Sequence, residues 1–366
     1  MANISFMLYD TIAWNTGFWG TLIGWFNSFI VSYGWTIIVF TLLLKLLLSP
    51  LDFWQRRAST KNVIQQAKLQ PELDKIKQKY AKDPEKMKQK LNEKQMEFMR
   101  SGQMKMGSTC TIMLVYLIVT MVVFLTLFGV MQSIGNTKTV NTYIQLENKY
   151  DVVLAETGSE DSAQDAVLEL YNSGTVTESW LWIDNIWKPD TRVSVVSSYN
   201  DFKNMAQKVG ESPYSFEEGK ENYLSEDKYN KVMAKIVTST EGRWNGYYIL
   251  IVLCGVVSFL TYQITALGNK KIMGAKGKGQ AQGLNMGGIM KWMLPIIMVL
   301  ITLFYSSAFA LYILANSTFT LLAIPVYNAI LRKTTKNINN SNNTSNGSKQ
   351  DINVDYKINK ITKIEE

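Results

Sequence analysis

One charged side chain lies inside a long apolar run, and its chemistry needs an explanation before any other. Lys45 interrupts the segment TIIVFTLLLKLLLS, residues 36–49, and we expect no acid near it in the sequence to partner it. A lysine near the middle of a membrane helix costs about 3 kcal/mol on insertion scales. Lys45 stands about six residues, roughly 9 Å at the α-helical rise, from the end of the apolar run. Two interpretations stay open: the ammonium reaches the membrane surface along its own helix, or it lines a wet cavity.

Catalytic chemistry has little support in the sequence. Ser49 lies one helical turn from Lys45, as an intramembrane serine–lysine hydrolase would need, but no supporting motif accompanies the pair. The chain has no histidine, which excludes imidazole acid–base catalysis and most zinc chemistry. Its two cysteines, Cys110 and Cys254, lie in apolar runs, so neither a disulfide framework nor a thiol-rich metal site is available. We therefore expect no enzymatic activity, no catalytic residue, no cofactor and no metal.

Three other polar residues interrupt later apolar runs. Gln263, Asn316 and Ser317 could face the same space as Lys45 and form a polar groove with it. Hydrogen bonds between neighbouring helices would explain the same residues without any groove. Both interpretations stay open, and the groove hypothesis assigns partner binding to Lys45, Gln263, Asn316 and Ser317.

Apolar runs of about 20 residues, enough to cross roughly 30 Å of hydrocarbon, alternate with strongly polar stretches. They predict transmembrane helices at residues 35–52, 109–132 and 246–267, and a pair within residues 289–331 that divides at Tyr305 and Ser306. Residues 1–34 include an aromatic stretch, Phe18 to Tyr33, which we expect to lie as a helix in the membrane interface. The predicted fold is an all-α polytopic membrane protein with a five-helix transmembrane core.

The distribution of Lys and Arg predicts the orientation of these helices. Basic residues gather in residues 53–108, 268–288 and 332–366, mostly as lysine, which favours the cytoplasmic side for these three segments. Residues 133–245 are rich in Asp and Glu and are expected to form an enlarged external loop domain, with helical pieces at DAVLELY and DKYNKVMAKIV. The N-terminus is then outside and the C-terminus cytoplasmic.

Residues 53–108 are predicted to form a cytoplasmic helical hairpin. Two stretches of good helix formers, Ala58 to Tyr80 and Pro84 to Ser101, flank a turn in which Asp83 can cap the second helix. Met87 shares one face of that helix with Leu91 and Phe98, whereas Met96 and Met99 point to other sides. In one interpretation Met87 and its neighbours pack on the partner helix and the other two methionines are incidental. In the other, Met96 and Met99 belong to an adaptable surface that touches apolar chains, so that Met87, Met96 and Met99 are the candidate contact residues of the hairpin.

Four segments in this order resemble the YidC-type membrane protein insertases, the family of the mitochondrial cytochrome oxidase assembly insertase and the chloroplast Albino insertase. They are YGWTIIVFTLLLKLLLSPLDFWQRR at 33–57, LQPELDKIKQKYAKDPEKM at 69–87, WLWIDNIWKPD at 180–190, and LPIIM with ALYILANS from Leu294 and Ala310. In that family a basic residue, usually Arg, precedes a Pro-Leu pair. Here Lys45 precedes Pro50 and Leu51 and keeps the charge without the forked donors of arginine.

The resemblance implies a membrane insertase and chaperone of the bacterial plasma membrane that helps client transmembrane helices to insert and fold. Lys45 in a wet groove would attract the acidic tail of a client, whose apolar helix then slides into lipid. The implied partners are client membrane proteins with short translocated tails and the lipid bilayer. The ribosome and the Sec translocon stay open as partners, and no DNA is expected. The alternative is a channel or secondary transporter with a lysine-lined cavity, although the chain shows no second copy of its first half.

Overall fold

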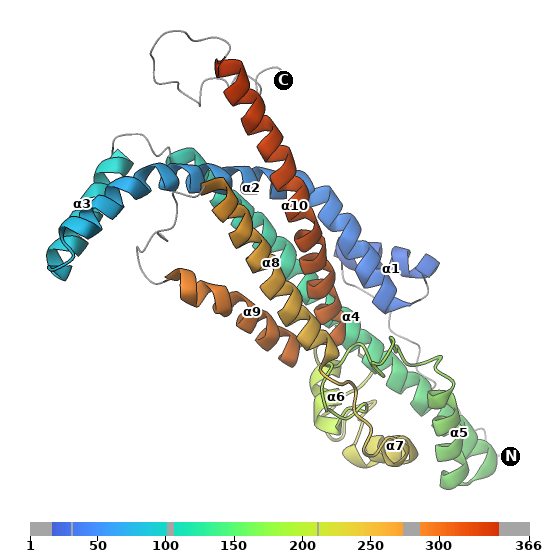
Figure 1. Cartoon of the computed structure of the whole chain (residues 1–366). Coiled ribbons are helices and arrows are strands. Elements are labelled where there is room, and N and C mark those ends of the chain that lie inside the picture. The colour runs from blue at the N-terminus through green and yellow to red at the C-terminus, as the bar shows by residue number, and fades with distance from the viewer. Residues whose placement is uncertain (1–16, 31, 101–105, 211, 274–285, 344–366) are drawn as a thin grey trace. The chain divides into compact units, whose positions relative to one another are not determined.

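The computed structural model describes residues 17–30, 32–100, 106–210, 212–273 and 286–343, and these are mostly helical (Figure 1). In chain order the helices are α1 (Gly17–Ile30), α2 (Tyr33–Lys79), α3 (Pro84–Arg100), α4 (Met106–Thr157), α5 (Glu160–Asn172), α6 (Tyr199–Ala206), α7 (Glu226–Ser239), α8 (Ile249–Met273), α9 (Met286–Phe304) and α10 (Ser307–Asn343). The chain divides into two units, Met1–Ile324 and Pro325–Glu366, so the second begins within α10.

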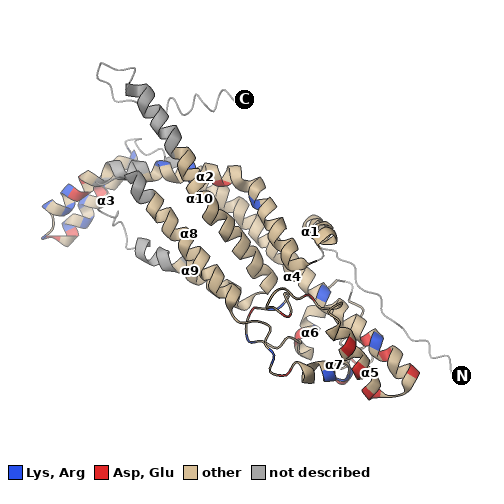
Figure 2. Ribbon diagram, turned by 45° about the vertical axis from the view of Figure 1, so that its right-hand side comes forward, with Lys and Arg blue, Asp and Glu red and all other residues tan. Residues whose placement is uncertain are grey.

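Several described helices are long and apolar enough to cross a membrane. The qualifying stretches are Tyr33–Val63, Thr111–Thr157, Ile249–Gly268 and Ser307–Leu331. A shorter apolar stretch, Pro295–Phe304, belongs to α9, whose 19 residues extend about 28 Å at the α-helical rise. Figure 2 shows charged residues gathered on α3 and around α5 to α7, whereas the ribbon of α8 is almost free of them. The chain is an all-α polytopic membrane protein, as the sequence predicts.

Helix α2 extends far beyond the first predicted span. The sequence predicts a span over residues 35–52 and a separate helix from Ala58, but one helix runs from Tyr33 to Lys79. It includes Pro50 and Pro71, each of which removes a backbone N–H donor. Pro50 lies in the stretch that can span a membrane, where helices tolerate proline because neighbouring groups satisfy the freed carbonyl, whereas Pro71 lies beyond that stretch. One arm of the predicted hairpin is thus a direct continuation of the spanning helix.

The second arm of the hairpin begins where the sequence predicts. Helix α3 starts at Pro84, and the carboxylate of Asp83 accepts a hydrogen bond of 3.1 Å from the backbone N–H of Lys86. This is the capping geometry expected of Asp before a proline at the first helical position. An ion pair of 3.0 Å between Lys94 Nζ and Glu72 joins α3 to α2.

Helix α4 also continues past its predicted span, residues 109–132, and ends at Thr157. Its last turns pack with α5, α6 and α7, and we call this assembly the loop domain. The predicted helical pieces within it are confirmed as α5 and α7, each capped by a serine hydroxyl that accepts a backbone N–H. The core of the loop domain includes Tyr143, Ile144, Leu146, Phe202, Tyr229 and Ile236.

A buried carboxylate ties this core together. Glu147 on α4 is only 1% exposed, and it accepts a hydrogen bond of 2.7 Å from the hydroxyl of Tyr214. Lys228 Nζ lies 2.7 Å from Glu147 and 3.0 Å from Asp151. Burial opposes the charged form of Lys228, but these two acids outweigh it and raise the pKa of the ammonium. The network therefore holds α7 against the last turns of α4.

Candidate functional site: a lysine-lined cavity in the helix bundle

A cavity of about 340 Å³ lies among α2, α4, α9 and α10. Its wall is largely apolar, and among the described residues that line it only Lys45 is charged. The lining residues are Thr41, Leu44, Lys45, Leu48, Tyr116, Leu117, Thr120, Met121, Val123, Phe124, Met298, Tyr312 and Asn316. Because α2 and α4 are both apolar enough to span a membrane, this partly open cavity lies within the helical membrane body.

The helical period of α2 turns Lys45 inward. Thr41, Leu44, Lys45 and Leu48 follow one another at spacings of three or four residues or stand side by side, which places them on one face. The next two side chains point away from the bundle, since Leu46 is 61% and Leu47 76% exposed. Lys45 itself is buried. Its side chain therefore lies in the bundle interior, where membrane helices keep their ionisable residues.

Lys45 has an acidic partner that the sequence interpretation missed. Its ammonium lies 3.3 Å from the carboxylate of Asp52, and the two side chains are only 11% and 12% exposed. Seven residues make almost two helical turns, so the two side chains share one face, and the roughly 10 Å between their Cα atoms along the axis is bridged by the long lysine stem. The expectation that no acid lies near Lys45 is therefore wrong, because Asp52 stands three residues beyond the apolar run that ends at residue 49. A search at helical spacings would have found the pair.

The polar residues predicted beside Lys45 divide into two groups. Asn316 on α10 lines the cavity, together with Lys45. Gln263 on α8 and Ser317 on α10 are half-buried and are not among the lining residues. Sequence reasoning did not name Thr41 and Thr120, whose hydroxyls donate to the backbone carbonyls of the preceding turn at 2.6 and 2.8 Å. Such internally satisfied hydroxyls carry no sequence signal that separates them from ordinary helix residues.

A tightly packed core closes the bundle between the cavity and the loop domain. Along α2 the cavity residues begin at Thr41, and the preceding Ile37 and Phe40 are buried in the core. Aromatic rings fill the space beyond the cavity, with Phe309 centred 5.0 Å from Phe128 and 5.3 Å from Phe124 in edge-on contacts. The cavity is therefore blocked toward the loop domain.

An aromatic loop, residues 180–190, reinforces this closure by holding the starts of two helices. The backbone N–H groups of Ser307 and Ala308, which begin α10, each donate a hydrogen bond of 2.8 Å to a carbonyl of the loop. Asp190 is buried, and its carboxylate accepts from the backbone N–H groups of Tyr247 and Leu250 at 2.8 and 2.6 Å. The loop thereby satisfies donors that a helix start leaves unpaired.

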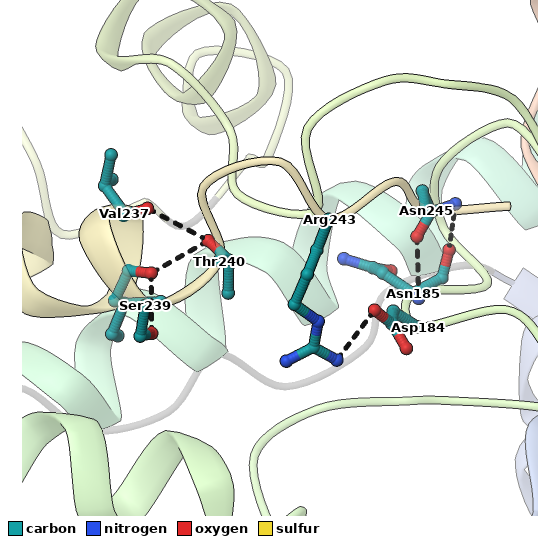
Figure 3. A network of polar contacts seen from close by, with 8 residues as sticks. Asp184, Asn185, Val237, Ser239, Thr240, Arg243 and Asn245 are labelled. Carbon is teal, nitrogen blue, oxygen red and sulfur yellow. Dashed lines mark hydrogen bonds and ion pairs between the residues drawn. The ribbon is translucent and has the colours of Figure 1, made fainter.

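A second set of polar contacts joins the aromatic loop to the segment after α7 (Figure 3). Asn245 and Asn185 exchange two hydrogen bonds, of 2.8 and 3.0 Å, each between a side-chain amide and the backbone. Arg243 reaches Asp184 at 2.9 Å. These contacts fix the loop from the side of the loop domain, so both ends of the closure are held.

The predicted contact residues of the hairpin differ in their accessibility. Met87 is half-buried, as a packing residue would be, whereas Met96 is 51% exposed. The side chain of Met99 lies outside the described residues. Of the two described methionine side chains, only that of Met96 is exposed.

Metal and thiol chemistry find little support in the part of the chain that the structure describes. No group of three or more His, Cys, Asp or Glu residues there could hold a metal ion. Cys254 is buried, and its Sγ lies 3.6 Å from the carbonyl oxygen of Ala310, so the thiol contributes to packing between α8 and α10. The side chain of Cys110 lies outside the described residues.

Comparison with known proteins points to one family. The family described as 60Kd inner membrane protein matches residues 25–334. A protein of Fusobacterium nucleatum named Membrane protein insertase YidC is 39% identical over 107 residues, which are 29% of this chain and 46% of that protein. Proteins of the same name from Thermotoga maritima and Pediococcus pentosaceus are 34% and 37% identical over 100 and 76 residues. Those segments cover 27% and 18% of this chain, and 20% and 26% of the two relatives.

The matched segments thus span less than half of each of these relatives, whereas the family match covers most of the present chain. It includes the cavity, the hairpin and the aromatic loop, which are the segments that carry the resemblance in the sequence. This chain belongs to the 60Kd inner membrane protein family, in agreement with the predicted likeness to the YidC-type insertases.

Proposed function

We propose that the chain is a membrane protein insertase in which the Lys45 cavity receives the short tail of a client and lets its apolar helix pass into lipid. The observation that carries this proposal is a cavity of about 340 Å³ with a buried lysine in its wall, inside spanning helices and blocked at one end. A permanent pore would not need that block. Its relatives, which bear the name Membrane protein insertase YidC, support the same activity.

The cavity is suited to a short polar segment. It holds a few side chains and not a whole helix, so the client helix would lie outside it, against the exposed apolar surface of α4. Leu117 and Met121 both line the cavity and are exposed on α4. A client could thus keep its tail near Lys45 while its helix contacts Leu117, Met121 and then lipid, gaining about 25 cal/mol for each Å² of apolar surface removed from water.

The orientation follows from the charge distribution. The hairpin of α2 and α3 is rich in lysine, which favours the cytoplasmic side, and the loop domain would then lie outside. In this orientation the cavity opens toward the side where clients are synthesised. The exposed Met96 on α3 is a candidate for a first, adaptable contact with an apolar client segment.

Reconstitution of the purified chain into liposomes tests the proposal. A client with one transmembrane helix and a short acidic tail should become protected from external protease as its tail enters the vesicle. Lys45→Arg should retain insertion, Lys45→Ala should lower it, and Lys45→Glu should lower it further because the new charge repels the tail. Leu47→Ala is the matched control, since Leu47 lies two residues away and faces outward.

The alternative, a channel or transporter, gives a different result in the same vesicles. It would release an entrapped ion or small solute and leave the client accessible to protease. If Lys45→Glu leaves insertion unchanged while Leu47→Ala lowers it, the cavity has no part in the mechanism. Equal client protection in vesicles without the protein would refute the proposed function as a whole.

A further inference from the structure

The ion pair in the cavity wall changes what the groove offers to a client. Lys45 is the charged lining residue, but its ammonium is 3.3 Å from Asp52 and both side chains are nearly excluded from the surface. The two formal charges cancel. A client tail that approaches therefore meets a dipole, whose field falls faster with distance than that of an isolated ammonium.

We infer that Asp52 is an internal counter-ion that sets client specificity by competing with the acidic residues of a client tail for Lys45. This inference rests on the proposed insertase function and deepens it. A client carboxylate has to displace Asp52 from the ammonium or share it with a second negative charge. Only tails that are sufficiently acidic, or that gain enough from apolar contacts, would be accepted.

The geometry of α2 makes the two side chains well placed for this exchange. Side chains on a helix lean toward its N-terminus, so Asp52 leans toward Lys45, whereas the long flexible stem of Lys45 has to extend in the opposite direction. The lysine can thus turn from Asp52 into the cavity without any backbone movement. Arg56 lies one turn beyond Asp52 and is also buried, which continues the row of charges toward the hairpin.

Burial makes the competition selective. Charges that are excluded from water interact more strongly than exposed ones and are screened less by salt. The pair is also held within one helix, so it re-forms whenever the client leaves. Asp52 therefore both lowers the cost of keeping a lysine inside the bundle and opposes the capture of acidic tails.

The test compares two clients that differ only in the translocated tail, one with two Asp residues and one with two Asn residues. Insertion of each into liposomes is measured by protease protection, and the quantity of interest is the acidic-to-neutral ratio for one preparation of protein. A loss of folded protein lowers both insertions equally and leaves this ratio unchanged. The variants are Asp52→Asn, Asp52→Glu, Lys45→Ala and the double variant Lys45→Ala with Asp52→Asn.

Asp52→Asn should raise the ratio by about threefold or more, a coupling typical of charges in contact. Asp52→Glu keeps the negative charge and should stay near the wild-type ratio. In the Lys45→Ala background, Asp52→Asn should raise the ratio much less than in the wild-type background, because the competed ammonium is gone and only direct repulsion between Asp52 and the tail is relieved.

An unchanged ratio for Asp52→Asn would overturn the inference, and so would an equal rise in the absence of Lys45, because Asp52 would then repel tails directly. In both cases the wild-type chain still inserts the clients, and the proposed function stands. Failure of the wild-type chain to insert either client would instead overturn the proposed function and this inference together.

Discussion

Replacement of Asp190 should separate the aromatic loop from the start of α8. The two carboxylate oxygens accept the backbone N–H groups of Tyr247 and Leu250 at 2.8 and 2.6 Å in a buried site. In Asp190→Ala both donors lose their acceptor. In Asp190→Asn one oxygen remains, and the amide nitrogen points a donor at another donor.

The magnitude follows from the number of donors left unpaired. A buried donor without a partner costs about 1–3 kcal/mol, and a negative charge at a helix start adds up to about 1 kcal/mol. We therefore expect Asp190→Ala to lower the free energy of unfolding by about 4 kcal/mol and Asp190→Asn by about 2 kcal/mol. Asp190→Glu would not rescue the site, because there is no room for a longer side chain. The backbone of Gly246 lies so close that a Cβ added there would overlap Asp190.

Urea unfolding in detergent micelles, with hydrogen exchange of the α8 amides, measures both effects. The matched control is Asp184→Asn in the same loop, whose ion pair with Arg243 is largely exposed and should contribute under about 1 kcal/mol (Figure 3). The increase in exchange should be greatest at the start of α8. If all three variants unfold alike, or if Asn is more damaging than Ala, the proposed capping role of Asp190 is refuted.

Three further predictions concern the loop domain, the aromatic loop and the orientation. Lys228→Met leaves the buried carboxylate of Glu147 without its cation and should destabilise the loop domain by about 3 kcal/mol; unchanged hydrogen exchange in α7 would contradict this. Burial lowers the pKa of Lys188 from 10.5 to about 8. Between pH 8 and 10.5 the unfolded chain then binds more protons than the folded chain. The free energy of unfolding of the wild type should therefore rise by about 1–3 kcal/mol over this range relative to that of Lys188→Met. An equal pH dependence of the two unfolding free energies, measured with urea, would refute the pKa shift. In intact cells, a membrane-impermeant thiol reagent should label the variant Asn172→Cys and should leave the variant Gln89→Cys unlabelled. The reverse labelling pattern would invert the orientation.

The parts of the fold that could be predicted are those with a local cause. Apolar length identified the spanning stretches, and the turn at Asp83 and Pro84 follows from capping chemistry. The continuity of α2 between its predicted span and the predicted helix from Ala58, and the end of α4, were not predicted. Beyond the apolar stretches, the residues of both helices favour a helix no more strongly than a loop. Contacts of α2 with α3, and of α4 with α5, decide that the helix continues.

The candidate site could be predicted only in part, for a related reason. Lys45 is conspicuous because its charge opposes its surroundings, and Asn316 stands out in the same way. Gln263 and Ser317 carry an equal signal in the sequence, yet they do not line the cavity. Which polar residue faces the cavity depends on the rotation of each helix about its axis, and packing between helices sets that rotation.

The arrangement of packed and open halves along the same helices gives the site its direction. In α2 the buried Ile37 and Phe40 precede the cavity residues, and the Asp52 partner of Lys45 follows them toward the hairpin. A tightly packed core therefore leaves no space for water and polar segments between Lys45 and the loop domain. A charge placed one or two turns nearer to the loop domain would be surrounded by aromatic rings and inaccessible to any client. Under the proposed function, the position of the lysine along α2, and not its charge alone, would make the groove one-sided.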